Sequence, residues 1–327
     1  IAEPAFPART RDKAVRKAID WSIERLNGED GLGAIYPAMA NAAMMFDHFG
    51  DAAHFDIAWN AVRKLLVVGE TEAYCQPCLS PVWDTALAGH ALAEAGDKDA
   101  LAAACDWLIP RQELELVGDW ADNTPGTRPG GWAFQYNNPH YPDVDDTAVV
   151  AMLLHRAGDP KYAESISRAR EWIIGMQSTN GAWGAFDINN DRQYLNHIPF
   201  ADHGALLDPP TEDVSARCIS FLAQLGHAED QPAIQRGIAY LRETQKPDGS
   251  WFGRWGTNYI YGTWSVLCAL NAAGIAHDDP MIEKAASWLI SKQRPDGGWG
   301  EDCETYADAP AGEFLSLIHI SEPTRPY

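Results

Sequence analysis

The chain has 327 residues, with 25 Lys and Arg against 46 Asp and Glu, which gives a formal net charge of −21. This balance argues against a nucleic-acid partner, because binding to phosphates needs a basic surface. The composition, 46% hydrophobic and 22% charged, is that of a globular protein, and no apolar run approaches the roughly 18 residues of a membrane-spanning helix. The 13 tryptophans outnumber both Phe and Tyr and require an explanation.

Both ends of the chain suggest a piece of a longer protein. The sequence begins at Ile1 without Met, a basic leader or an apolar signal segment, and a helical pattern starts almost at once. Residues 315–327 resemble a translated sequencing adapter. We therefore expect a non-native tail there and exclude it from the fold prediction, with a frayed native C-terminus as the alternative.

The first of two alternating helix types is apolar and ends in Gly. Each terminal Gly is a candidate for the left-handed residue that ends a helix. Within these helices, residues 148–154 and 219–223 are apolar on every side, which is typical of buried helices. The expected ranges are 34–50, 80–96, 143–158, 210–226 and 258–274.

The second type is an amphipathic helix in which an aromatic residue is followed five positions later by Gln, and then by a Gly-x-Trp turn. We expect the indole N–H to cap a carbonyl and the Gln to reach the free N–H groups of the next helix. A looser copy runs from Trp107 to Trp120. The clear copies comprise Trp172, Gln177 and Trp183; Tyr240, Gln245 and Trp251; and Trp288, Gln293 and Trp299.

Alternating buried and amphipathic helices predict an all-α fold, an (α/α) barrel or toroid of concentric inner and outer helices. No convincing strand period of two is present. We predict a partial α-barrel domain over residues 1–77, a catalytic (α/α)-barrel domain over 78–314 and the non-native tail over 315–327.

Three carboxylates, Asp143, Asp145 and Asp146, stand at the start of the apolar helix expected at 143–158. Asp143 and Asp146 lie about 60° apart on one helix face. Close like charges raise the pKa of at least one member, whereas a helix N-terminus favours ionised carboxylates. The spacing alone leaves four interpretations open: a general acid, an N-cap with additional acids, a magnesium or calcium site, and a solvated turn.

The segment Asp143-Val-Asp145-Asp146-Thr-Ala, together with the repeated Gln-x-x-x-Gly-x-Trp pattern, resembles the squalene–hopene cyclase family of class II triterpene cyclases. The resemblance runs nearly continuously from about residue 1 to residue 314 and corresponds to the middle of the family chain. The other segments that match are 80–85, 196–200, 251–263 and 297–303.

The resemblance implies that Asp145 is the general acid that protonates the terminal alkene of squalene, with Asp143 and Asp146 as its supporting pair. Well-known family members carry, at the position of Arg217, a His that hydrogen-bonds the acid. A guanidinium is permanently cationic. Arg217 would therefore either lower the pKa of Asp145 or pair with Asp143 or Asp146 and leave Asp145 protonated.

The implied carbocation needs a dry pocket lined by aromatic rings. Core packing is the alternative explanation for each lining residue, and Phe186 stands where Tyr is often found. By motif match the lining comprises Trp83, Phe134, Phe186, Trp255 and Tyr261, and positions near the substrate channel and pocket are Ile35, Tyr36, Pro37, Phe200 and Ala201.

Cysteine and histidine patterns give little support for a metal or redox site. Cys75 and Cys78 form a C-x-x-C without a second pair at zinc-ribbon spacing, so we expect structural thiols in a reducing compartment. His197 and His203 lack a third ligand, and the acidic loop 187–191 lacks the Gly and Glu of an EF-hand. We expect no metal and no other cofactor.

The function implied by the resemblance is proton-initiated polycyclisation of squalene to hopene or hopanol, an intramolecular isomerase (mutase) reaction. Because squalene resides in bilayers, the full-length protein is expected to be monotopic on the cytoplasmic face of the cell membrane. Its acidic surface does not attract anionic lipids, so an apolar patch should hold it there. The family also implies a homodimer when full length, and the 327-residue chain alone is expected to be inactive.

Two alternatives remain open. One is a class II cyclase that acts on another polyprenoid. The other is a non-catalytic α-toroid, a binding module in which the three aspartates merely cap a helix.

Overall fold

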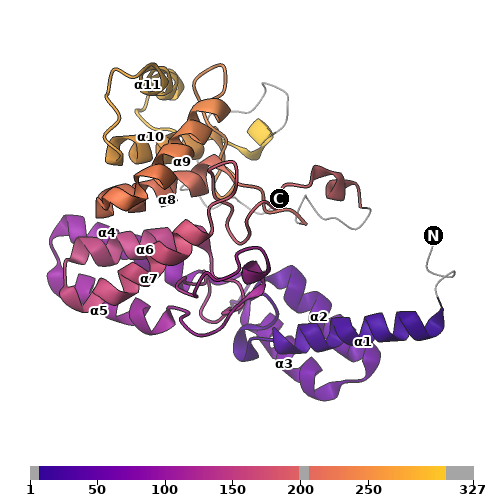
Figure 1. Ribbon diagram of the computed structural model, residues 1–327. Coiled ribbons are helices and arrows are strands. Elements are labelled where there is room, and N and C mark those ends of the chain that lie inside the picture. The colour runs from indigo at the N-terminus through magenta and orange to yellow at the C-terminus, as the bar shows by residue number, and fades with distance from the viewer. Residues whose placement is uncertain (1–6, 199–205, 307–327) are drawn as a thin grey trace. The chain divides into compact units, whose positions relative to one another are not determined.

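The computed structural model describes residues 7–198 and 206–306 (Figure 1). The described chain is predominantly helical, and the predicted all-α class of α/α-toroid type is confirmed. Contacts divide the chain into two compact units. Unit 1 comprises Ile1–Asp119 and Trp132–Pro142, and unit 2 comprises Trp120–Gly131 and Asp143–Tyr327. The domain boundary expected between residues 77 and 78 stays a prediction.

Unit 1 contains five α-helices within the described residues. An apolar cluster of Ala42, Ala43 and Phe46 with Ala58 joins the second helix to the third, and side chains of the first helix pack against it. The helices are α1 (Ala8–Glu24), α2 (Tyr36–Phe49), α3 (Ala52–Lys64), α4 (Pro81–Ala95) and α5 (Lys98–Leu108).

Unit 1 also contains a short β-hairpin that we did not predict. Strand β1 (Leu66–Val68) pairs antiparallel with β2 (Ala73–Cys75), and all six residues are exposed. Strands of three residues with both faces exposed cannot display an alternating pattern, so no periodic signal for them was present. Cys75 and Cys78 are free thiols.

Unit 2 shows the predicted alternation of more buried and amphipathic helices, and Figure 1 shows these helices in chain order from α6 to α11. Its inner helices are α6 (Val144–Ala157), α8 (Glu212–Leu225) and α10 (Tyr259–Ala272). Helix α8 packs against both α6 and α10, and each inner helix packs against the outer helix that follows it. The outer helices are α7 (Ala163–Gly175), α9 (Gln231–Thr244) and α11 (Pro280–Lys292).

Short 3₁₀ turns connect these elements. They are η2 (Gly28–Asp30), η3 (Ile109–Arg111), η4 (Asp119–Asp122), η5 (Pro160–Tyr162), η6 (Gln193–His197), η7 (Ala228–Asp230) and η8 (Cys303–Tyr306).

The predicted glycine C-caps are confirmed. Gly50, Gly96, Gly158 and Gly226 have left-handed φ angles of 71°, 76°, 69° and 72°. Gly274, at φ 71°, follows α10 one position later than expected. Glycine adopts this conformation without the steric penalty of a side chain, so each of these residues ends its helix at a defined place.

The repeated tryptophans cap carbonyls as predicted. The indole N–H groups of Trp183, Trp251 and Trp299 donate to the carbonyl ten residues earlier, in the preceding outer helix. The acceptors are Ile173, Leu241 and Leu289, at 2.7, 2.7 and 2.8 Å. Each repeat therefore ties its turn back onto its own helix.

The repeated glutamines contact the next outer helix, as predicted, but they donate to its carbonyl groups and do not accept from its free N–H groups. Gln177 Nε2 donates to the carbonyls of Gly181 and Ala233, at 2.8 and 2.9 Å, and Gln245 makes the equivalent pair of bonds. Ala233 lies in the first turn of the next outer helix. Two carbonyls converge on the amide nitrogen of each Gln, which donates to both, and the Oε1 of Gln177 accepts from the Arg236 side chain and not from the free backbone N–H groups of the next helix.

Candidate active site

Asp143 is the N-cap of α6, with extended backbone angles (φ −98°, ψ 132°). Its Oδ1 accepts the backbone N–H groups of Asp145 and Asp146, at 2.7 and 3.2 Å. The N–H of Val144 donates to the carbonyl of Ala185 at 2.8 Å, which fixes the start of the helix. Asp143 therefore caps the helix, which is one of the four roles that the spacing of the three aspartates left open.

The side chains of Asp145 and Asp146 do not take part in this cap. They are only 6% and 2% exposed, and the Oδ1 atom of each has no hydrogen-bond partner. All residues of α6 from Val144 to Leu154 are buried, so the first turn lies inside unit 2. A buried carboxylate oxygen without a donor is rare and costly in a folded protein, which marks both groups for a chemical explanation.

Burial raises the pKa of Asp145 to about 6; the Arg217 cation opposes this shift and the Asp213 carboxylate adds to it. Burial and neighbouring carboxylates raise the pKa values of Asp143 and Asp146 well above the ordinary range. Loss of hydration disfavours the charged form of each acid, and close like charges add to that effect. The cluster therefore retains protons near neutral pH.

Arg217, on α8, is the cation next to this cluster. Its Nε lies 3.6 Å from Asp145 Oδ1. Its Nη2 donates to the Tyr261 hydroxyl at 2.7 Å and its Nη1 to Ser265 Oγ at 3.3 Å. The guanidinium carbon lies 5.1 Å from the ring centroid of Trp264. Of the two pairings left open by the sequence, the structure shows the one with Asp145.

Asp213, near the start of α8, is also fully buried, at 0% exposure. Its Oδ2 accepts the backbone N–H groups of Arg254 and Trp255, both at 2.8 Å. Its Oδ1 accepts the Thr211 hydroxyl and the Val214 N–H, at 2.6 and 3.0 Å. This carboxylate holds the loop that carries Trp255.

Three of the predicted lining aromatics lie in unit 2. The rings of Phe186 and Trp255 meet edge to face, with centroids 6.0 Å apart and planes at 78°. Tyr261 lies 6.0 Å from Trp264, one turn further along α10. Trp255 is 47% exposed, so its ring is accessible. The structure thus brings Asp143, Asp145, Asp146, Arg217 and Tyr261 together and places Phe186 against Trp255.

The other predicted pocket and channel residues that the structure describes belong to unit 1. Trp83 is in the first turn of α4, and the N–H of its neighbour Val82 donates to the carbonyl of Phe134 at 3.4 Å, so these two segments meet. Ile35 pairs with Cys78 across an isolated bridge. Tyr36 and Pro37 form the first turn of α2. Phe200 and Ala201 lie outside the described residues.

Several residues of this site were missed by the sequence analysis: Asp208, Ser265 and Trp264, and the role of Asp213. Ser265 and Trp264 lie one helical turn beyond Tyr261, so their spacing on α10 was an available signal. Asp213 lies four residues before Arg217 on α8, so helical spacing was an available signal for it as well. Asp208 lies in an irregular polar stretch, where no spacing rule points to it.

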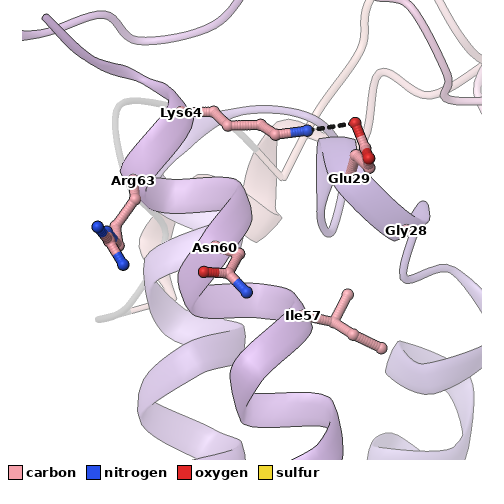
Figure 2. Close-up of a pocket in the computed structure, with 6 residues that line it drawn as sticks. All are labelled: Gly28, Glu29, Ile57, Asn60, Arg63 and Lys64. Carbon is pink, nitrogen blue, oxygen red and sulfur yellow. Dashed lines mark hydrogen bonds and ion pairs between the residues drawn. The ribbon is translucent and has the colours of Figure 1, made fainter.

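A pocket of about 670 Å³ in unit 1 contains none of the predicted residues. Figure 2 shows that an ion pair between Lys64 and Glu29 bridges two of its walls. The remaining lining residues are Gly28, Ile57, Asn60 and Arg63.

The arrangement of the carboxylates also bears on the metal interpretation. Asp143 Oδ1 is already engaged by two backbone N–H groups. In the parts of the chain that the structure describes, no group of three or more His, Cys, Asp or Glu side chains could hold a metal ion. The geometry instead presents buried acids beside a guanidinium, which is suited to holding and releasing a proton.

Comparison with known proteins places this geometry in a family. The squalene-hopene cyclase N-terminal domain model matches residues 1–71, and the C-terminal domain model matches residues 79–315. The chain is 62% identical over 286 residues to a probable squalene–hopene cyclase of Sinorhizobium fredii, covering 84% of this chain and 44% of that protein. It is 63% identical over 325 residues to the squalene-hopene cyclase of Schizosaccharomyces japonicus, covering 95% and 50%.

Among solved structures, the type II terpene cyclase MstE from Scytonema is 26% identical, with a TM-score of 0.49, covering 66% of this chain and 56% of that one. The chain spans about half the length of the curated relatives it matches. Both family models match in chain order and together span most of the sequence. The chain belongs to the squalene–hopene cyclase family.

Proposed function

We propose that the full-length protein containing this chain cyclises squalene, and that Asp145 starts the reaction by protonating a terminal carbon–carbon double bond. One observation carries the proposal: Asp145 is a buried acid whose pKa is raised to about 6 and whose Oδ1 has no hydrogen-bond donor. An acid with a pKa near the working pH holds its proton and can also release it.

The neighbours of Asp145 fit both sides of the proton transfer. Before transfer, burial favours the protonated acid. After transfer, the proton is bonded to the substrate carbon and Asp145 is a carboxylate 3.6 Å from the Arg217 guanidinium. The cation favours that carboxylate and so strengthens the acid in its buried site. Tyr261 and Ser265 hold the guanidinium in place.

The aromatic residues fit the second requirement, the stabilisation of a carbocation. A cation over an aromatic ring gains roughly 0.5–2 kcal/mol, with the larger value in a desolvated site. In the proposal, Phe186 and Trp255 face the cation in unit 2. The edge-to-face contact between Phe186 and Trp255 limits the freedom of both rings.

The alternative of a non-catalytic toroid explains less of the site. It requires the three aspartates to act as a helix cap, which Asp143 does. It gives no reason for the partnerless Oδ1 atoms of Asp145 and Asp146 or for the buried Arg217. A class II cyclase for another polyprenoid would use the same acid and would be recognised by its products.

The wider assignments belong to the same proposal. The reaction class is an intramolecular isomerisation, and no metal or other cofactor takes part. The substrate dissolves in bilayers, so the protein is monotopic on the cytoplasmic face of the cell membrane and forms a homodimer. In residues 7–198 and 206–306, no helix has both the length and the hydropathy to cross a bilayer.

The test is squalene turnover by the full-length protein in detergent micelles, with products identified by gas chromatography and mass spectrometry. The parent protein should give pentacyclic hydrocarbon or alcohol. Asp145→Asn should lower turnover by about 10²–10⁴-fold, the usual contribution of a positioned acid. Asp159→Asn, an exposed carboxylate beyond the other end of α6, is the matched control. Equal turnover by Asp145→Asn would remove Asp145 from the mechanism.

A further inference from the structure

Asp208 stands outside every motif that supported the sequence prediction, yet it is only 9% exposed. Its carboxylate accepts three consecutive backbone N–H groups. Oδ1 accepts from Ala185 at 3.1 Å, and Oδ2 accepts from Phe186 and Asp187 at 2.6 and 2.8 Å. Burial raises the pKa of Asp208, and these bonds oppose the shift. One carboxylate therefore fixes the main chain on both sides of Phe186.

The loop held by Asp208 in turn holds the start of the acid-bearing helix. The carbonyl of Ala185 accepts the N–H of Val144, the first residue of α6, at 2.8 Å. Asp143 and Asp145 flank Val144 in the chain. A short chain of hydrogen bonds thus runs from Asp208 through Ala185 to the acid cluster.

The approach of Asp208 to this loop is unusually close. A Cβ atom added at Gly184 would lie 2.8 Å from both the carbonyl oxygen and Oδ2 of Asp208. Only glycine leaves room there without displacing one of the two segments. This close packing indicates that the carboxylate and the loop are built as one unit.

The same arrangement occurs again one repeat later. Phe186 follows the repeat residue Trp183 by three positions, and Trp255 follows Trp251 by four. Asp213 accepts the backbone N–H groups of Arg254 and Trp255. The two rings held in this way, Phe186 and Trp255, meet edge to face.

We propose that Asp208 is a positioning residue for cyclisation, which fixes the ring of Phe186 beside that of Trp255 and the start of α6 beside them. This inference rests on the proposed function. Phe186 has no hydroxyl through which its ring could be anchored, so the position of the ring depends on the main chain that Asp208 holds. A displaced ring stabilises the cation at the wrong place, and cyclisation then ends early.

The experiment compares Asp208→Asn with Asp191→Asn in the full-length protein. The Asn side chain keeps one acceptor oxygen and turns an NH₂ group toward at least one of the three N–H donors. Asp191 is an exposed carboxylate on the loop that follows Phe186 and serves as the matched control. Two quantities are measured: hydrogen exchange of the amides at 185–187, and the distribution of products from squalene.

For Asp208→Asn we expect amide exchange at 185–187 to become at least about tenfold faster, because each lost bond lowers the free energy of local opening. The kcat should fall roughly 10- to 100-fold with little change in KM, since a displacement of about 1 Å has effects of that size. The share of incompletely cyclised products should rise several-fold. Asp191→Asn should match the parent protein in all three.

A second variant, Gly184→Ala, disturbs the same contact from the loop side and should shift the products in the same direction. It keeps the test possible if Asp208→Asn does not fold. Faster exchange with an unchanged product distribution would overturn the positioning role, and so would unchanged exchange. If the parent protein forms no cyclised product from squalene, the proposed function itself fails. The exchange measurement then still reports whether Asp208 holds the loop.

Discussion

Asp145 on α6 and Asp213 on α8 are two buried carboxylates in the first turns of neighbouring inner helices, and they have opposite hydrogen-bond environments. Asp213 accepts four hydrogen bonds, two at each oxygen. Asp145 Oδ1 accepts none and faces Arg217 at 3.6 Å. Depth of burial is nearly the same for the two side chains, so burial alone does not distinguish them.

The difference lies in what compensates each oxygen. A carboxylate saturated by N–H and O–H donors has its burial compensated by those bonds and fixes the backbone that donates to it. A buried carboxyl group with an oxygen that has no donor is more stable with its proton, and the nearby guanidinium lowers its proton affinity. The first is a structural group, and the second can act as an acid.

The largest change in this comparison comes from removing the cation. Arg217→Ala should lower the free energy of unfolding at pH 8 by about 3–5 kcal/mol, because it leaves the buried Asp145 unpaired. The loss should be smaller at pH 5, where Asp145 binds a proton instead. Urea unfolding at both pH values measures it. Arg242→Ala, which breaks an exposed pair with Asp279, should change less than about 1 kcal/mol. Equal losses at the two pH values would contradict the pairing with Asp145.

The second prediction concerns pH alone. The pKa of Asp145 is raised from 3.8 to about 6, so the folded state binds the proton more tightly than the unfolded chain does. Its contribution to stability is complete below pH 3.8 and is lost as pH rises through about 6. The loss amounts to about 3 kcal/mol.

Asp145→Asn should remove this part of the decline, as measured by urea unfolding from pH 4 to pH 8. The rest of the decline in stability should persist in this variant, because the pKa values of Asp143 and Asp146 are also raised. A variant whose stability declines with pH as steeply as the parent protein would show that Asp145 does not titrate in this range.

The third prediction concerns the saturated carboxylate. Asp213→Asn should lower the free energy of unfolding by about 2–3 kcal/mol, because the amide leaves buried N–H donors without an acceptor. Urea unfolding of the variant and the parent protein measures the loss. Asp191→Asn should lie within about 0.5 kcal/mol of the parent protein. A loss no larger than that of Asp191→Asn would show that the bonds to Asp213 do not hold the loop.

The smallest effect is expected at the hydroxyl that holds the cation. Tyr261→Phe removes the 2.7 Å bond from Arg217 and should lower stability by about 1.5 kcal/mol, as for a hydrogen bond to a charged group. Tyr240→Phe, whose hydroxyl donates to the uncharged carbonyl of Pro210, is the control and should lose less. In the full-length protein, Tyr261→Phe should shift the pH profile of kcat, since Arg217 is less firmly held. An unchanged profile would separate Tyr261 from the acid.

Much of the helical architecture was readable from local patterns. The glycines at 50, 96, 158 and 226 end their helices as the sequence predicted. Trp183 and Trp251 cap carbonyls ten residues earlier, within reach of a pattern search. Asp143, Asp145 and Asp146 were visible as a cluster because they are adjacent in the chain.

What the sequence left open lies in contacts between distant residues. Gln177 acts as a donor because the carbonyl of Ala233, 56 residues away, accepts from it. The main chain at Phe186 is fixed by a hydrogen bond to Asp208, 22 residues away. The four acids Asp143, Asp145, Asp208 and Asp213 are chemically identical in the sequence.

By itself the sequence determined the helix order, the helix ends, the repeat and the identity of the acid cluster, because each depends on residues within one or two turns. Only the tertiary structure decided that the Oδ1 of Asp145 lacks a donor and faces Arg217, while both oxygens of Asp208 and of Asp213 accept hydrogen bonds. The reason is physical. The proton affinity of a carboxyl group is set by the water, charges and donors around it, and those come from whatever the fold packs against it.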